Sequence, residues 1–104
     1  MVEIKIRREG STRLLKMTGH ADYAKDGQPD IICAACSALL YAFLGWLSNH
    51  PAEYEEEEPI RVCPGDVTVK LRVKGPFLDT ALDSALEGFS QLARTAPDSV
   101  RLLQ

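Results

Sequence analysis

The chain has 104 residues, of which 45% are hydrophobic and 26% are charged, and its formal net charge is −3. A chain of this length usually forms one domain, and this composition excludes disordered and collagen-like proteins. Residues 1–52 carry six Lys/Arg against five Asp/Glu, whereas residues 53–104 carry six against ten. We therefore expect a single domain over residues 1–104 that does not bind nucleic acid directly.

The first ten residues, MVEIKIRREG, alternate apolar and charged side chains. They lack the continuous apolar region and the small-residue cleavage site of a signal peptide, so we expect a cytoplasmic protein. The chain has three cysteines. An odd number of cysteines in a chain without an export signal favours reduced thiols over a disulfide framework.

The N-terminal alternation continues after a turn at REGST, which predicts that residues 1–18 form a β-hairpin. Residues 19–30 follow without any periodicity and contain Gly19, Gly27 and Pro29. A loop of this length is uncommon in a compact domain and favours a functional role.

Residues 31–48, IICAACSALLYAFLGWLS, are apolar on every helical face. Length and hydropathy alone would allow a short membrane helix. A buried core helix is favoured, because no Lys/Arg cluster flanks the segment and the elements on both sides are amphipathic. Burial on every face would require a sheet on one side and another chain on the other. We therefore predict a homodimer that does not enter a membrane.

Pro51 ends this helix. The segment AEYEEEEP that follows has five glutamates in six positions, which favours a solvated edge strand or loop. The segment lacks the Asp/Asn/Gly spacing of a calcium loop. The next fifteen residues, PIRVCPGDVTVKLRV, predict a second hairpin with Pro64 and Gly65 in its turn.

Apolar residues recur at helical spacing from Leu78 to Ala93, which predicts an amphipathic helix that ends near Pro97. The last residues, SVRLLQ, are suited to one more short strand. The predicted order is therefore ββαββαβ. This order indicates an α+β (mixed α/β) fold in which two helices pack on a mixed, mostly antiparallel sheet.

Cys33 has the most reactive position of the three cysteines. Asp30 is a good N-cap for the apolar helix, so Cys33 becomes the third helical residue. There the positive end of the helix dipole and the unpaired amides favour a thiolate. Cys36 lies one turn further in, and both Cys36 and Cys63 are interpreted as packing residues.

Three kinds of chemistry remain open for His20 and the cysteines. In a cysteine hydrolase, His20 would take the thiol proton, and the helix-start amides, including that of Cys33, would hold the oxyanion. In a redox protein, Cys33 and Cys36 would form a C-x-x-C dithiol. A structural zinc site would use Cys33, Cys36, Cys63 and His20. A C-x-x-C inside a regular helix, with no second pair and no strand leading into it, weakens the last two.

The segment GHADYAKDGQPDIICAACSALL resembles the ribosomal-processing cysteine protease family, also called YsxB-like. The recognisable pieces are Gly19-His20-Ala21, the run from Asp30 to Ala35, and Ser37. The predicted order of elements is also similar to the fold of that family.

The resemblance implies a cysteine endopeptidase that removes the N-terminal extension of large-subunit ribosomal protein twenty-seven. It implies that Cys33 is the nucleophile and His20 the base, with Asp30 and Ser37 in supporting positions. It also implies a dimer that needs no cofactor or metal. We expect the loop that contains Gly19, Ala21 and Gly27 to close over the peptide substrate. Cys36 keeps the redox alternative open.

Overall fold

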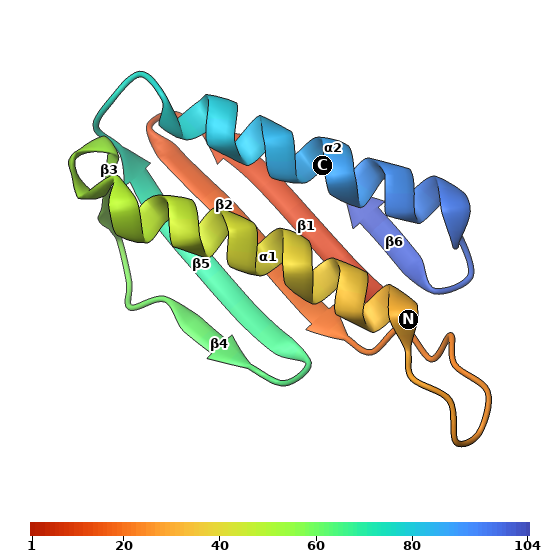
Figure 1. Cartoon of the computed structure of the whole chain (residues 1–104). Helices are drawn as coiled ribbons and strands as arrows, with labels where there is room; N and C mark the ends of the chain where they lie inside the picture. The colour runs from red at the N-terminus through yellow and green to blue at the C-terminus, as the bar shows by residue number, and fades with distance from the viewer.

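The sheet is built from six strands, and the computed structural model describes residues 1–104. Strands β1 (Val2–Glu9) and β2 (Thr12–Gly19) form the N-terminal hairpin, with Val2 opposite Gly19 and Glu9 opposite Thr12. Strand β5 (Asp66–Val73) pairs antiparallel with β2, and β6 (Val100–Leu103) pairs parallel with β1. The first and last strands of the chain therefore lie side by side, with β6 at the edge of the sheet (Figure 1).

Two short strands share the free edge of β5. Strand β3 (Tyr54–Glu56) pairs with the C-terminal end of β5, and β4 (Arg61–Cys63) pairs with its N-terminal end. A 3₁₀ turn, η1 (Pro51–Glu53), leads into β3. The sheet is thus mixed and mostly antiparallel, as predicted, and β3 is the edge strand that the glutamate-rich segment allowed. The predicted fold class is confirmed.

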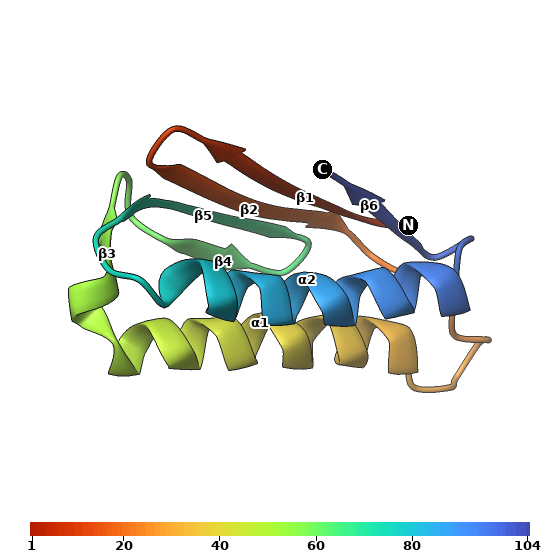
Figure 2. The ribbon, with the colours of Figure 1, turned by 90° about the horizontal axis from the view of Figure 1, so that it is seen from above.

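The helices α1 (Ile31–Asn49) and α2 (Leu78–Thr95) lie side by side on one face of the sheet. Figure 2 shows the two layers, with nothing over the other face of the sheet. The helices approach closely at Gly88, where an added Cβ would collide with the Leu39 side chain. Figure 1 shows the loop between β2 and α1 extending beyond the N-terminal end of α1.

A single hydrophobic core fills the space between the helices and the sheet. Nineteen buried apolar residues form it, including Ile4 and Leu15 from the sheet and Phe89 from α2. Alternate residues of the strands and one stripe of each helix are apolar, and both face the space between the sheet and the helices.

Helix α1 is buried along one stripe and open along the other. The buried residues recur at spacings of three and four, whereas the side chains of Ile31 and Tyr41 are each 61% exposed. By length and composition alone the helix could cross a membrane. Its buried stripe packs on the sheet, and its outer face has no partner within this chain. The buried residues are Ile32, Cys36, Leu40, Phe43 and Leu47.

Candidate active site

Asp30 caps the N-terminus of α1, as predicted. Its backbone is extended, and its carboxylate accepts a hydrogen bond from the Cys33 N–H at 2.9 Å. The same carboxylate accepts from the N–H groups of Tyr23 at 3.0 Å and Ala24 at 3.4 Å. These bonds, led by that from Cys33, lower the pKa of Asp30. One charged side chain therefore fixes both the helix start and the loop in front of it.

Cys33 lies in the first turn of α1, half-buried under this loop. Its Sγ atom accepts a hydrogen bond from the Ala21 N–H at 3.4 Å, and Ala21 is buried. The loop thus returns to the thiol and places a backbone donor beside it. The N-terminal end of the helix dipole also lies at this turn.

The Cys33 N–H, which we expected to hold an oxyanion, is engaged elsewhere in the free chain. Asp30 already accepts a hydrogen bond from this amide, because the third amide of a helix is the usual donor to an N-cap. The Ala21 N–H is the backbone donor in contact with the Cys33 sulfur.

His20 follows directly after β2 and lies against the turn between β4 and β5. A Cβ added to Gly65 would lie 2.9 Å from Nε2 of His20, and Gly65 has a φ of +71°. The Gly19 N–H donates to the Gly65 carbonyl at 2.9 Å. The absence of a side chain at Gly65 therefore has two effects: it permits the left-handed turn, and it leaves room for the imidazole ring of His20.

His20 and Cys33 line the same cleft, which has a volume of about 340 Å³. Ser37 and Tyr41 follow Cys33 along this wall at intervals of one helical turn. The Cys33 sulfur accepts its hydrogen bond from the Ala21 amide, and not from the His20 ring. The remaining lining residues are mostly apolar: Val2, Met17, Gly19, Cys36, Leu40, Val62, Cys63, Pro64, Gly65, Asp66 and Val67.

The family model described as "Cysteine protease Prp" matches residues 1–101. The chain belongs to this family of cysteine proteases. Its fold is similar to that of the ribosomal processing protease Prp from S. aureus with a covalently linked product peptide. That match has a TM-score of 0.76 and 19% identity, over 99% of this chain and 98% of the other.

Two further solved structures have the same fold as this Prp family member. SMU.848 from Streptococcus mutans has a TM-score of 0.70 and 21% identity, over 99% of this chain and 94% of the other. S. aureus Prp in complex with a substrate peptide has a TM-score of 0.64 and 23% identity, over 97% and 94%. No curated protein matches the chain.

The state of the cysteines bears on the two alternatives to a Prp protease, the dithiol redox site and the zinc site. Cys36 is 2% exposed, and burial, followed by the nearby Cys33 and Asp30, raises its pKa to about 11. A thiol in this state is a poor partner for disulfide exchange. The three cysteines are free. No three His, Cys, Asp or Glu side chains form a group that could hold a metal ion.

The packing interpretation is confirmed for Cys36 and wrong for Cys63. Cys63 is exposed, because it lies at the end of β4, an edge strand whose three residues are all exposed. Sequence reasoning also missed the contact of Gly65 with His20 and the position of Tyr41 on the cleft wall. The turn signal at Pro64-Gly65 was visible in the sequence, but nothing local linked it to His20.

Proposed function

We propose that this Prp family protease removes the N-terminal extension of large-subunit ribosomal protein twenty-seven by a Cys33/His20 dyad in the cytoplasm. The observation that carries the proposal is that His20 and the helix-start thiol of Cys33 line one cleft, which is open to a peptide. Support also comes from the motif around both residues and from the similar S. aureus protease, whose structures hold a product or substrate peptide.

In this mechanism His20 takes the proton of the Cys33 thiol, and Sγ attacks the scissile carbonyl carbon. The carbonyl oxygen becomes an oxyanion beside the reactive sulfur. The Ala21 N–H, 3.4 Å from Sγ in the free chain, is the donor we assign to it. His20 then gives its proton to the leaving amine and activates the water that releases the acyl group.

The loop between β2 and α1 supplies both His20 and the Ala21 amide, so its position controls the dyad. Asp30 anchors the loop through Tyr23 and Ala24, whereas a Cβ at Gly27 would meet nothing within 4 Å. We propose that the tip of the loop around Gly27 closes over the bound peptide and brings the imidazole to the thiol.

The open face of α1 supports a homodimer. Ile31 and Tyr41 are large apolar side chains exposed on this face, and a second chain would remove them from water. Light scattering during gel filtration tests this point, because the monomer mass of 11.5 kDa would double.

The deciding experiment incubates the purified protein with the ribosomal protein precursor and identifies the products by mass spectrometry. Cys33→Ala should abolish cleavage, and His20→Ala should slow it by about two to four orders of magnitude, because general acid–base catalysis contributes that much. Cys36→Ala and Cys63→Ala are matched controls that should still cleave.

Cleavage that survives Cys33→Ala would overturn the protease mechanism. Activity lost only with Cys36→Ala would favour dithiol redox chemistry. Stoichiometric zinc in the untreated protein, lost together with structure on chelation, would favour the zinc site.

A further inference from the structure

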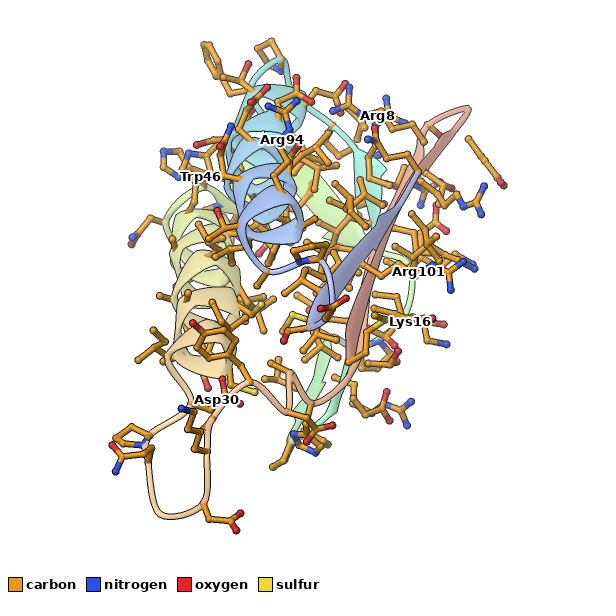
Figure 3. The ribbon with its side chains drawn as sticks, turned by 90° about the vertical axis from the view of Figure 1, so that its right-hand side faces the viewer. Arg8, Lys16, Asp30, Trp46, Arg94 and Arg101 are labelled. Carbon is orange, nitrogen blue, oxygen red and sulfur yellow. The ribbon has the colours of Figure 1, made fainter.

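The sheet has a second face, away from both helices, and most of the chain's positive charge lies on it. Strand alternation and register place seven of the twelve Lys and Arg residues there. Figure 3 shows Lys16 and Arg101 on this side. The seven are Lys5, Arg7, Lys16, Arg61, Lys70, Arg72 and Arg101.

The cations on this face are sorted into rows across the strands. One row has Lys5 opposite Lys16, followed by Thr68 and Arg61. The next row has Arg7 opposite Leu14, followed by Lys70. We call these two rows the basic band, which contains Lys5, Arg7, Lys16, Arg61 and Lys70.

Acidic residues border the basic band on both sides, and Glu57 stands opposite Lys70 at the end of one of its rows. Glu3 and Asp66 belong to the row on one side, and Glu9 and Glu55 to the row on the other. Glu57 reaches Lys70 only from the sheet edge, at 3.9 Å. Asp66 pairs with Arg61 at 3.0 Å. The overall charge of −3 nevertheless conceals a cluster of cations on this face.

Three cations of the band have no carboxylate within 4.0 Å: Lys5, Arg7 and Lys16. Like charges directly opposite each other in an antiparallel pair, as in Lys5 and Lys16, destabilise a sheet. Two cations elsewhere in the chain, Lys25 and Arg94, are also unpaired, but they lie apart. The fold thus concentrates unneutralised charge at one place without a structural benefit.

The band also contains a hollow of about 320 Å³. Lys5, Arg7 and Lys70 line it, together with Leu14 and two residues of the bordering row, Glu9 and Thr12. Leu14 lies inside the band, and Leu103 stands beside Lys5 at the end of its row. The hollow offers several cations to one bound group.

From this arrangement we propose that the basic band binds the phosphate backbone of double-stranded RNA. A protein partner would need an apolar centre to its interface, whereas nucleic-acid interfaces are polar and strongly basic. Stacking on single-stranded bases requires aromatic side chains, and the band has none. Duplex RNA is recognised through phosphates and 2′-hydroxyls, and the Thr68 hydroxyl lies among the cations to meet the latter.

The band and the catalytic cleft use different surfaces. The cleft lies against α1 and the turn between β4 and β5, whereas the band faces away from the helices. The charge pattern does not depend on the proposed protease function, and RNA binding is measured without any peptide substrate. If the protein acts on a ribosomal protein, the band would hold it to the RNA that such proteins bind.

The test measures fluorescence anisotropy of a labelled 20-base-pair RNA duplex between 50 and 200 mM salt. The variant Lys5→Gln/Lys16→Gln removes two unpaired cations from the band, and the matched control Lys25→Gln/Arg94→Gln removes two elsewhere. We expect the first to weaken binding about tenfold and to reduce the salt slope by roughly 1.5, because each phosphate contact contributes about 0.7 to 0.9. The control should bind as the parent chain does.

Two further arms separate RNA from other polyanions. A DNA duplex of the same sequence should compete less well than RNA, and Thr68→Val should remove that difference. Poly-L-glutamate at equal charge should compete weakly.

The proposal is overturned if the parent chain does not bind RNA at 50 mM salt, or if the control variant loses as much affinity. It is also overturned if DNA or polyglutamate competes equally. Lys5→Gln/Lys16→Gln should melt no lower than the parent chain, since a like-charge pair is removed, and it should retain cleavage. Loss of binding is thereby separated from unfolding and from failure of the protease function.

Discussion

The two walls of the cleft are built by different kinds of interaction. On the helix wall, Asp30, Cys33 and Ala21 lie within a short stretch of sequence and are joined by local hydrogen bonds. On the sheet wall, His20 lies against Gly65, which is distant in the sequence. The thiol is therefore positioned by the start of one helix, whereas the imidazole depends on the assembled sheet. Substitutions on the sheet wall should therefore lower activity, relative to folding stability, more than substitutions on the helix wall do.

Among changes that leave the dyad residues in place, the largest expected effect comes from Gly65→Ala. The added Cβ would lie 2.9 Å from Nε2 of His20, so the ring must move, and we expect cleavage to slow at least tenfold. The control is Gly10→Ala, which also has a positive φ, of +57°, but no neighbour within 4 Å. Both changes should cost about 1 to 2 kcal/mol of folding stability from left-handed strain, measured by urea unfolding. Equal effects of the two on activity would contradict the role of Gly65.

A smaller effect is expected from Asp30→Ala. It removes the acceptor for the Cys33 amide and for two loop amides, so activity should fall several-fold and the melting temperature should drop. Asp30→Asn keeps a side-chain oxygen suited to an N-cap and should retain more of both.

The pH dependence of the same group has a defined sign. The pKa of Asp30 is lowered in the folded chain, so its stabilising contribution is present above the unfolded pKa of about 4. The contribution is lost as the pH falls through the lower folded pKa. Thermal melts of the parent chain and Asp30→Asn from pH 7 to pH 2 should converge at the acid end. Parallel curves would argue against the charge of Asp30.

The change with the smallest expected effect on cleavage is Cys36→Ala, which distinguishes Cys36 from Cys33. The pKa of Cys36 is raised from 9.0 to about 11 by burial, so its contribution is complete below about pH 9. It is lost as the pH rises toward 11, because the unfolded chain then releases the proton first. The stability difference between the parent chain and Cys36→Ala should therefore shrink by up to about 2 kcal/mol in urea melts at pH 8 and pH 10.5. A constant difference would mean that Cys36 is accessible to solvent when folded.

The sequence predicted the helix wall well because its determinants are local. An aspartate followed by an apolar run places Cys33 three residues into a helix, and the cap on its amide is observed. The cap also means that this amide already has an acceptor in the free chain. The sequence also predicted the hairpins from their alternation and turns.

Contacts between residues distant in the sequence could not be predicted from local patterns. Nothing near His20 indicates that Gly65 will lie beneath its ring, because this contact exists only after β5 has paired with β2. Cys63 was assigned to packing because an isolated apolar residue in a strand pattern does not reveal whether its strand lies at the edge. The basic band was hidden for the same reason, since register across strands, and not composition, aligns its cations.

The hydrogen bond from Gly19 to Gly65 also sets an order of events during synthesis. The helix wall can form once α1 has left the ribosome, but the sheet wall must wait until the turn before β5 has emerged. Closing a loop this long is entropically costly and slow compared with forming a helix. We therefore expect a nascent chain to contain the Cys33 thiol before it has a cleft, and the cleft to form only when more than half of the 104 residues have been made.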